Sequence, residues 1–284
     1  MKLQIAYCRL QIGLAVAFAA AVAVAGSSAQ APTGGGGRTA VFDELLDLHV
    51  RDGMVYYRAL KSERPRLESY LGSLAAANIE TAPREEQMAF WINAYNALVL
   101  ATVVANYPIV QRTREYPPRS IRQIPGAFER LQHRVAGRML TLDQIEQTVL
   151  AGFHDPRVFF ALGRGAMGSG RLRSGAYVSR DLERQLSEVA DECPDRSSCA
   201  QVDRLDNRVN ISSIFSWREK EFAAVYAERA PAVFRERSPI ERAAIAFLTP
   251  KLVTAERDLL AKNEFKTEFI PFDWSLNDLT GRGQ

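Results

Sequence analysis

Apolar residues recur at helical spacing along most of the chain after residue 38, and short extended runs separate the periodic segments. The spacing predicts helices over residues 42–48, 63–74, 84–106, 141–150, 179–191 and 249–262, and further helices that begin at Ser213 and Ser238. Short strands are expected over residues 54–57, 158–162, 208–211 and 265–270, with a hairpin over 134–140. Because helices and strands do not alternate regularly, we predict the α+β class: a helix-dominated single domain with a few short strands in a small antiparallel or mixed sheet.

The segment over residues 84–106 gives the strongest helix signal. It is apolar on nearly every face, which is typical of a helix at the centre of a core. Asn93, Asn96 and Thr102 interrupt the apolar surface, and these polar residues argue against a membrane span. Because Asn93 and Asn96 lie three residues apart on one face, we expect their amides to satisfy buried backbone groups of neighbouring segments.

The first residues have the pattern of a cleavable signal peptide over residues 1–29. Lys2 and Arg9 precede an apolar run of 14 residues over 12–25, too short for a permanent membrane span, which needs about 20 residues. Small residues then allow cleavage after Ala29 or after Ala25. We therefore expect a periplasmic or secreted protein with a flexible leader over residues 30–38 and one globular domain over 39–284. The alternative is an uncleaved membrane anchor.

Charge gives no support to nucleic-acid binding. The whole chain has 36 basic and 33 acidic residues, and removal of the signal peptide lowers the basic count to 34. Nucleic-acid binding requires a sustained positive surface, which so balanced a domain does not predict. The pattern implies no cofactor either.

Cys193 and Cys199 are the two cysteines that remain after cleavage, and they bracket a hydrophilic turn. In an exported protein such a pair is typical of a local disulfide. Closing so short a loop would add about 2–2.5 kcal/mol in the chain-entropy model. A metal site is the alternative, but no His and no third Cys lies nearby in the sequence, so we predict none.

A loop rich in Gly and Arg follows the expected strand at 158–162. Residues 163–168 match G-x-G-x-x-G, but the loop continues to the helix expected near Ser179, so the pattern does not predict a dinucleotide site. Backbone amides and guanidinium groups there would suit an anionic small molecule or an acidic protein surface. The candidate ligand-binding residues are Arg157, Gly163, Arg164, Gly165, Ser169, Arg171 and Arg173. The alternative is a solvated loop whose arginines point to water.

Four sequence blocks carry a family resemblance. They are residues 89–98 (AFWINAYNAL), 140–146 (LTLDQIE), 155–157 followed by 160–162 (DPR and FAL), and 272–277 (FDWSLN). Their order and spacing, across about residues 42–277, resemble the domain of unknown function 547 family. The signature residues are Trp91, Asn93, Tyr95, Asn96, Asp273, Trp274 and Asn277.

The same resemblance implies a thiol site that this chain lacks. Typical members have two His residues, an Asn-Cys pair and a later Cys, and here those positions hold other residues. They are Gln147, Phe159, Gly163-Arg164 and Ser169. A thiolate nucleophile needs sulfur and usually a nearby base, so the resemblance and the departures together predict that thiol chemistry is absent.

Three hypotheses on function follow. The first is an exported, non-catalytic binding or scaffolding domain that uses the Gly/Arg loop. The second is a hydrolase or transferase that acts without a thiol, with Glu146, His154 and Ser169 as its candidate catalytic residues. The third is a partner subunit of a more complete relative. We also expect Glu146 to pair with Arg157.

Overall fold

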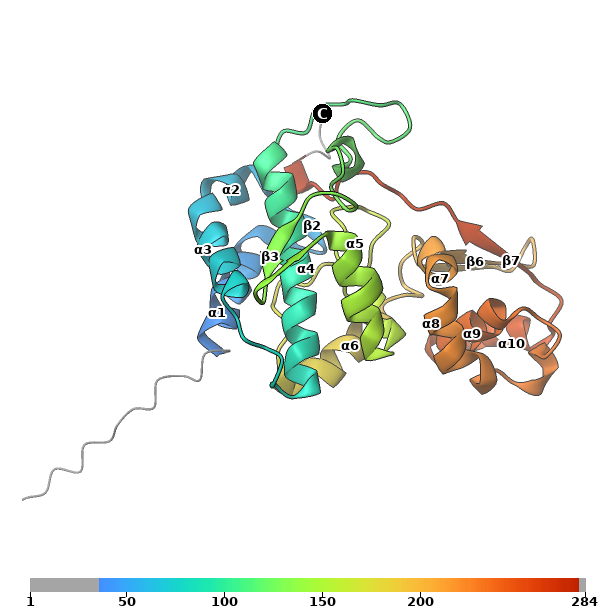
Figure 1. Cartoon of the computed structure of the whole chain (residues 1–284). Coiled ribbons are helices and arrows are strands. Elements are labelled where there is room, and N and C mark those ends of the chain that lie inside the picture. Colours follow the sequence, from blue (N-terminus) through green and yellow to red (C-terminus); the bar gives the residue numbers. More distant parts are fainter. Residues whose placement is uncertain (1–35, 281–284) are drawn as a thin grey trace, which may run out of the picture.

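The computed structural model describes residues 36–280 (Figure 1). The predicted signal peptide and most of the leader lie outside these residues, and Gly36–Arg38, which we assigned to the leader, form the first turn of helix α1. The helices are α1 (Gly36–His49), α2 (Tyr57–Ser62), α3 (Arg64–Ala75), α4 (Arg84–Asn106), α5 (Leu142–Gln144), α6 (Leu182–Asp191), α7 (Ser213–Trp217), α8 (Glu219–Tyr226), α9 (Pro239–Leu248) and α10 (Thr254–Ala261).

The strands form three small sheets among these helices. Two are antiparallel pairs, β1 (Val50–Arg51) with β2 (Met54–Val55) and β3 (His133–Val135) with β4 (Arg138–Leu140). The third sheet has the order β5 (Ala200–Asp203), β6 (Arg208–Ser212) and β7 (Lys266–Ile270); β6 runs antiparallel to β5 and parallel to β7. The helix-dominated α+β class is therefore confirmed.

Helix α4 is the centre of the fold, as its all-round apolar surface predicts. Within residues 36–280 it is the one helix long and apolar enough to cross a membrane, but its side chains are buried inside the protein. Its two asparagines bind other segments: the Asn93 amide exchanges hydrogen bonds with the backbone of Tyr177. Asn96 donates to Ala161 O at 3.0 Å and accepts from Gly163 N at 2.8 Å. These contacts confirm the predicted role of both amides, because they hold each end of the Gly/Arg loop against the core helix.

The C-terminal half of the chain packs against the N-terminal half through aromatic rings. In Figure 1, α8, α9 and α10 lie to one side of the helices that surround α4. Phe160 reaches from the N-terminal half into this group, with ring centroids 5.4, 5.7 and 5.5 Å from Phe215, Phe222 and Phe247. After β7 the chain returns to the N-terminal half, where Asn277 O accepts from Val55 N at 2.8 Å. One continuous core therefore joins the two halves.

Local sequence signals account for several boundaries. Thr141 and Gln144 form the expected capping box, and so do Ser238 and Glu241, with a proline at the first helical position of α9. The hairpin turns at residues 136–137, where both residues have positive φ. These signals are local in sequence, so the structure follows them.

Two predicted elements are wrong. The strand expected over residues 158–162 is a 3-10 helix, Pro156–Phe160, which the Asp155 side chain caps by accepting from Arg157 N. A run of five apolar residues is too short for its periodicity to distinguish a strand from a helix. The strand was therefore predicted from the apolar character of the run alone. The last helix begins at Thr254 instead of Thr249, because Thr249–Lys251 form a 3-10 turn that continues α9.

Candidate functional site

Glu146 lies at the centre of a buried cluster of charges. It belongs to the π-helical turn Ile145–Leu150 that follows α5, and its side chain is 9% exposed. Its Oε1 accepts from Arg164 Nη2 at 2.6 Å and from Arg218 Nη2 at 2.8 Å. Its Oε2 accepts from Tyr95 Oη at 2.9 Å and from Arg164 Nε at 3.1 Å. Both oxygens are thus held by two donors each, in a geometry that fixes the carboxylate.

Arg164 is the largest fully buried side chain of the described residues, at 2% exposure. Besides its bidentate contact with Glu146, its Nη1 donates to Phe159 O at 3.1 Å, and its backbone N donates to Ser169 Oγ at 3.0 Å. A buried guanidinium needs such partners because an unpaired charge would be very costly there. The Gly/Arg loop therefore begins with an arginine that points into the protein.

The pairing dominates the electrostatics of this cluster. Burial opposes the ionisation of Glu146, but Arg164 and Arg218 outweigh it and lower the pKa of Glu146 to about 2. Burial and then the Glu146 charge raise the pKa of Tyr95 far above its ordinary value, so Tyr95 remains a neutral donor. Asp143 differs: burial, then Glu129 and Glu146, raise the pKa of its carboxyl.

A cavity of about 290 Å³ opens beside this cluster, and we call it the Glu146 pocket. It is lined by Arg122, Phe128, Asp143, Glu146, Gln147, Arg164, Trp217, Arg218 and Trp274. Trp217 and Arg218 come from the end of α7, and Trp274 from the segment after β7. The two halves of the chain thus build the pocket together.

Part of the chain matches a known family. Residues 79–192 match the model of a family described as "Protein of unknown function, DUF547". The resemblance to this family is therefore confirmed over residues 79–192. No curated protein and no solved structure matches the chain.

The matched segment contains Gln147, Phe159, Arg164 and Ser169, where the resemblance implies His or Cys in typical members, and the structure brings these residues together. Gln147 and Arg164 both line the Glu146 pocket. Phe159 accepts from Arg164 and lies 4.4 Å from the Arg218 guanidinium, and Ser169 accepts from the Arg164 backbone. A buried arginine and its partners therefore occupy the region to which the resemblance assigns a thiol.

The other loop arginines contact carboxylates of the chain itself. Arg157 binds Asp155 and Glu183, so the expected pair of Arg157 with Glu146 is wrong. Its place within the 3-10 helix explains the difference, since the turn directs Arg157 toward α6. Helix α6 and the residue that follows it supply carboxylates to two further arginines. These pairs are Arg171 with Glu192, and Arg173 with Glu188.

The loop glycines are explained by close packing. Gly165 has a φ of +68°, which favours glycine, and a Cβ on Gly170 would lie 1.8 Å from Phe160 O. A Cβ on Gly163 would lie 3.1 Å from the Leu172 side chain. The G-x-G-x-x-G pattern thus packs against the core and forms no cradle at a helix N-terminus, as the sequence predicted.

The candidate catalytic residues are only partly brought together. Arg164 links Glu146 to Ser169, and both are buried. His154 lies at the surface, in a left-handed conformation that ends the 3-10 turn Ala151–Phe153. Within residues 36–280, no group of three His, Cys, Asp or Glu side chains is placed to hold a metal ion.

The signature residues have structural contacts. Trp91 packs edge-on to Phe90, and the Asp273 side chain accepts from Ser275 N. Asn277 accepts from Tyr57 Oη and donates to Gly53 O, both at 2.8 Å, which fixes the returning C-terminal segment. The predicted disulfide between Cys193 and Cys199 is confirmed.

Five residues of the Glu146 pocket were missed by the sequence reasoning: Arg122, Phe128, Asp143, Trp217 and Arg218. Arg218 lies 72 residues from its partner Glu146, and no local pattern could join them. Asp143 offered a weak signal, because it lies one helical turn before Gln147.

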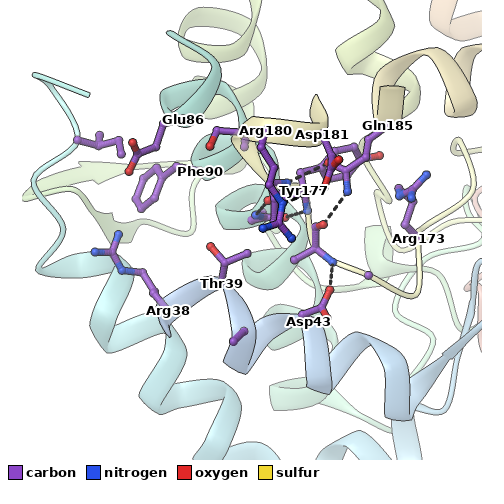
Figure 2. A pocket seen from close by; sticks show the side chains of 18 of the residues that line it. Arg38, Thr39, Asp43, Glu86, Phe90, Arg173, Tyr177, Arg180, Asp181 and Gln185 are labelled. Atoms are coloured by element: carbon purple, nitrogen blue, oxygen red, sulfur yellow. Dashed lines mark hydrogen bonds and ion pairs between the residues drawn. The ribbon is translucent and has the colours of Figure 1, made fainter. Parts of the chain in front are cut away.

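A larger cleft of about 850 Å³ lies between α1, the start of α4 and residues 173–181 (Figure 2). Figure 2 shows Phe90 and Glu86 on one side of it and Arg173 and Gln185 on the other. Asp43 accepts from Ala176 N at 2.8 Å, and Gln185 bonds the backbone on either side of Tyr177. Several polar side chains of this cleft are therefore committed to holding the loop.

Proposed function

We propose that this protein is an exported ligand-binding domain with an ion-paired pocket in the region where the resemblance implies a thiol site in typical relatives. The binding site is the Glu146 pocket, and the domain does not break bonds in its ligand. The observation that carries the proposal is the fixed state of Glu146, held by two guanidinium groups and one phenol.

A carboxylate in this state is a poor catalyst. General acids and bases work best when their pKa lies near the working pH, and the two arginines lower the pKa of Glu146 to about 2. Its oxygens already accept four hydrogen bonds, so attack on a substrate would break contacts that neutralise buried arginines. Ser169 is buried and accepts a hydrogen bond from the backbone, while His154 lies at the surface. This arrangement supports binding over hydrolysis.

The pocket is a better ligand site than the exposed part of the Gly/Arg loop. An anionic molecule or an acidic protein would have to displace the carboxylates that already hold Arg157, Arg171 and Arg173. In the pocket, by contrast, Trp217 is 46% exposed, and Asp143 and Gln147 face the cavity from one helical segment. Concave sites with aromatic walls and a few convergent polar groups are the usual form of small-molecule sites.

Export is supported by the disulfide as well as by the signal-peptide pattern. Disulfides persist in oxidising compartments, so the Cys193–Cys199 bond is consistent with an exported protein. The bond lies next to Glu192, which pairs with Arg171 of the Gly/Arg loop. N-terminal sequencing of the protein from a periplasmic or culture fraction tests this point. A mature N-terminus after Ala29 or Ala25 supports export, and an intact Met1 in the cytoplasm contradicts it.

The binding function is tested by ligand-observed NMR with a library of small polar compounds. We expect at least one compound to bind and to lose its signal in Trp217→Ala, which opens one wall of the pocket. Phe269→Ala is the matched control, because Phe269 is 40% exposed on β7. In parallel, hydrolysis of p-nitrophenyl acetate should equal the rate in buffer; turnover that Ser169→Ala abolishes would support the hydrolase instead.

A further inference from the structure

Each arginine of the Glu146 pocket is already paired with a carboxylate of the protein. Arg122 binds Glu129, and Arg164 binds Glu146. Arg218 also binds Glu146, and its Nη1 lies 3.6 Å from Oε1 of Glu221. Each of the three guanidinium groups is thus paired with a carboxylate, and among residues 36–280 Arg122 Nε is the one buried guanidinium nitrogen of this pocket without a hydrogen-bond partner. A free anion would have to compete with carboxylates that are already in place. A cationic ligand is also disfavoured, because the Arg122 guanidinium lies 4.5 Å from the Trp274 ring. The balance favours a ligand without net charge.

Two polar side chains of the pocket nevertheless have open hydrogen-bonding positions. Asp143 and Gln147 lie four residues apart and both line the cavity, and neither side chain has a hydrogen-bond partner among residues 36–280. Asp143 offers carboxylate acceptors, and the Gln147 amide offers donors and an acceptor. A hydroxyl group can donate to the first and accept from the second, so hydroxyls satisfy both residues together.

Phe128, Trp217 and Trp274 add aromatic surface to the lining of the pocket, and Phe272 packs behind two of these rings. Trp217, Phe272 and Trp274 pack on one another, with ring centroids 4.8 Å apart for Trp217–Phe272 and 4.5 Å for Phe272–Trp274. Trp217 still leaves nearly half of its surface open. Burying an indole face against the apolar face of a ring is favourable. The cavity of about 290 Å³ lies at the small end of ligand sites, which suits one ring.

We propose that the Glu146 pocket binds a neutral polyhydroxylated ring, of the saccharide class, which lies against Trp217 and hydrogen-bonds to Asp143 and Gln147. This inference rests on the proposed binding function and adds the ligand class to it. The buried Glu146–Arg164–Arg218 cluster forms the floor that holds both walls in place, since Arg218 follows Trp217 directly and Glu146 lies between Asp143 and Gln147 in the helical segment.

The test is a titration of the full mature protein with saccharide probes, in which binding is measured by saturation-transfer NMR and by tryptophan fluorescence. The neutral probes are D-glucose, D-galactose, D-mannose and myo-inositol, and the charged probes are glucuronate and glucosamine. We expect a neutral probe to bind with a Kd in the range of about 10 μM to 1 mM. Trp217→Ala should weaken that binding about fivefold or more, whereas Phe269→Ala should leave it unchanged.

Asp143→Asn provides a second variant that keeps the shape of the pocket and removes one carboxylate acceptor. It should weaken the neutral probe about threefold or more, and its circular dichroism should match that of the unchanged protein. Because Asp143 is only half-buried, this variant should fold even if loss of the Trp217 ring disturbs the aromatic wall.

The outcomes separate this inference from the proposed function. If glucuronate binds at the pocket and no neutral probe does, the ligand class is wrong while the binding function stands. If a neutral probe binds equally to both pocket variants, the inference is also overturned. If no saccharide and no library compound binds, both proposals fail.

Discussion

The Glu146 cluster makes a quantitative prediction about stability. Glu146→Gln keeps the shape of the side chain but removes its charge, which leaves the buried Arg164 without a counter-ion and deprives Arg218 of its closer one. Breaking a buried ion pair from one side costs about 3–5 kcal/mol. The pKa of Glu146 gives a second value for the loss of stability. It is about 2 against an ordinary 4.5, and because each pKa unit corresponds to about 1.4 kcal/mol, this shift corresponds to roughly 3 kcal/mol.

The assay is equilibrium unfolding in guanidinium chloride at neutral pH, supported by calorimetry. A loss of about 3–5 kcal/mol should lower the Tm by roughly 6–20 °C for a domain of this size. Glu129→Gln is the matched control, because Glu129 holds Arg122 near the surface and such pairs contribute about 0–1 kcal/mol. A double variant in which Arg164→Met accompanies Glu146→Gln should recover part of the lost stability, since it removes the unpaired charge.

The pH dependence checks the same reasoning. The folded pKa of Glu146 lies below the unfolded value, so its contribution is complete above about pH 4.5 and is lost as the pH falls toward 2. Glu146→Gln should therefore flatten the stability profile in that range. If the variant unfolds within about 1 kcal/mol of the unchanged protein and keeps the same acid slope, the cluster does not stabilise the fold as argued.

Three further predictions follow from single features. Gly170→Ala should cost about 3 kcal/mol or prevent folding, because its Cβ would lie 1.8 Å from a backbone carbonyl oxygen; Gly152→Ala, with open space around it, should change the unfolding midpoint little. Reduction of the Cys193–Cys199 disulfide should lower the free energy of unfolding by about 2 kcal/mol, and equal stability with and without reductant would refute this. The pKa of Asp143 is raised, so its carboxylate takes up a proton at a higher pH than an ordinary Asp does. As the pH is lowered, saccharide affinity should therefore begin to fall before an ordinary Asp would titrate. Titrations at several pH values should show this dependence, and Asp143→Asn should abolish it.

Local patterns in the sequence predicted those parts of the fold that depend on neighbouring residues. The all-round apolar surface of α4, the caps at Thr141 and Ser238, and the hairpin over 134–140 each follow from contacts within a few residues. The Asn93 and Asn96 contacts were predictable in kind, because a buried amide must find partners, although the segments it binds were not.

The charged pocket could not be predicted in the same way. Arg218 reaches Glu146 because the two halves of the chain pack together, through Phe160 and its neighbouring rings among other contacts. Arg157 is close to Glu146 in sequence but turns toward Glu183, since residues 156–160 form a 3-10 helix and not a strand. Partner choice among many arginines and carboxylates depends on tertiary packing, on which a single sequence carries little information.

The position of Phe160 has a practical consequence for anyone who expresses part of this chain. A fragment that stops at residue 192, where the family match ends, would expose this ring to water and leave Glu146 with one arginine instead of two. Such a fragment should aggregate. A stable fragment should therefore extend beyond the matched segment, at least to Trp274, which lines the Glu146 pocket.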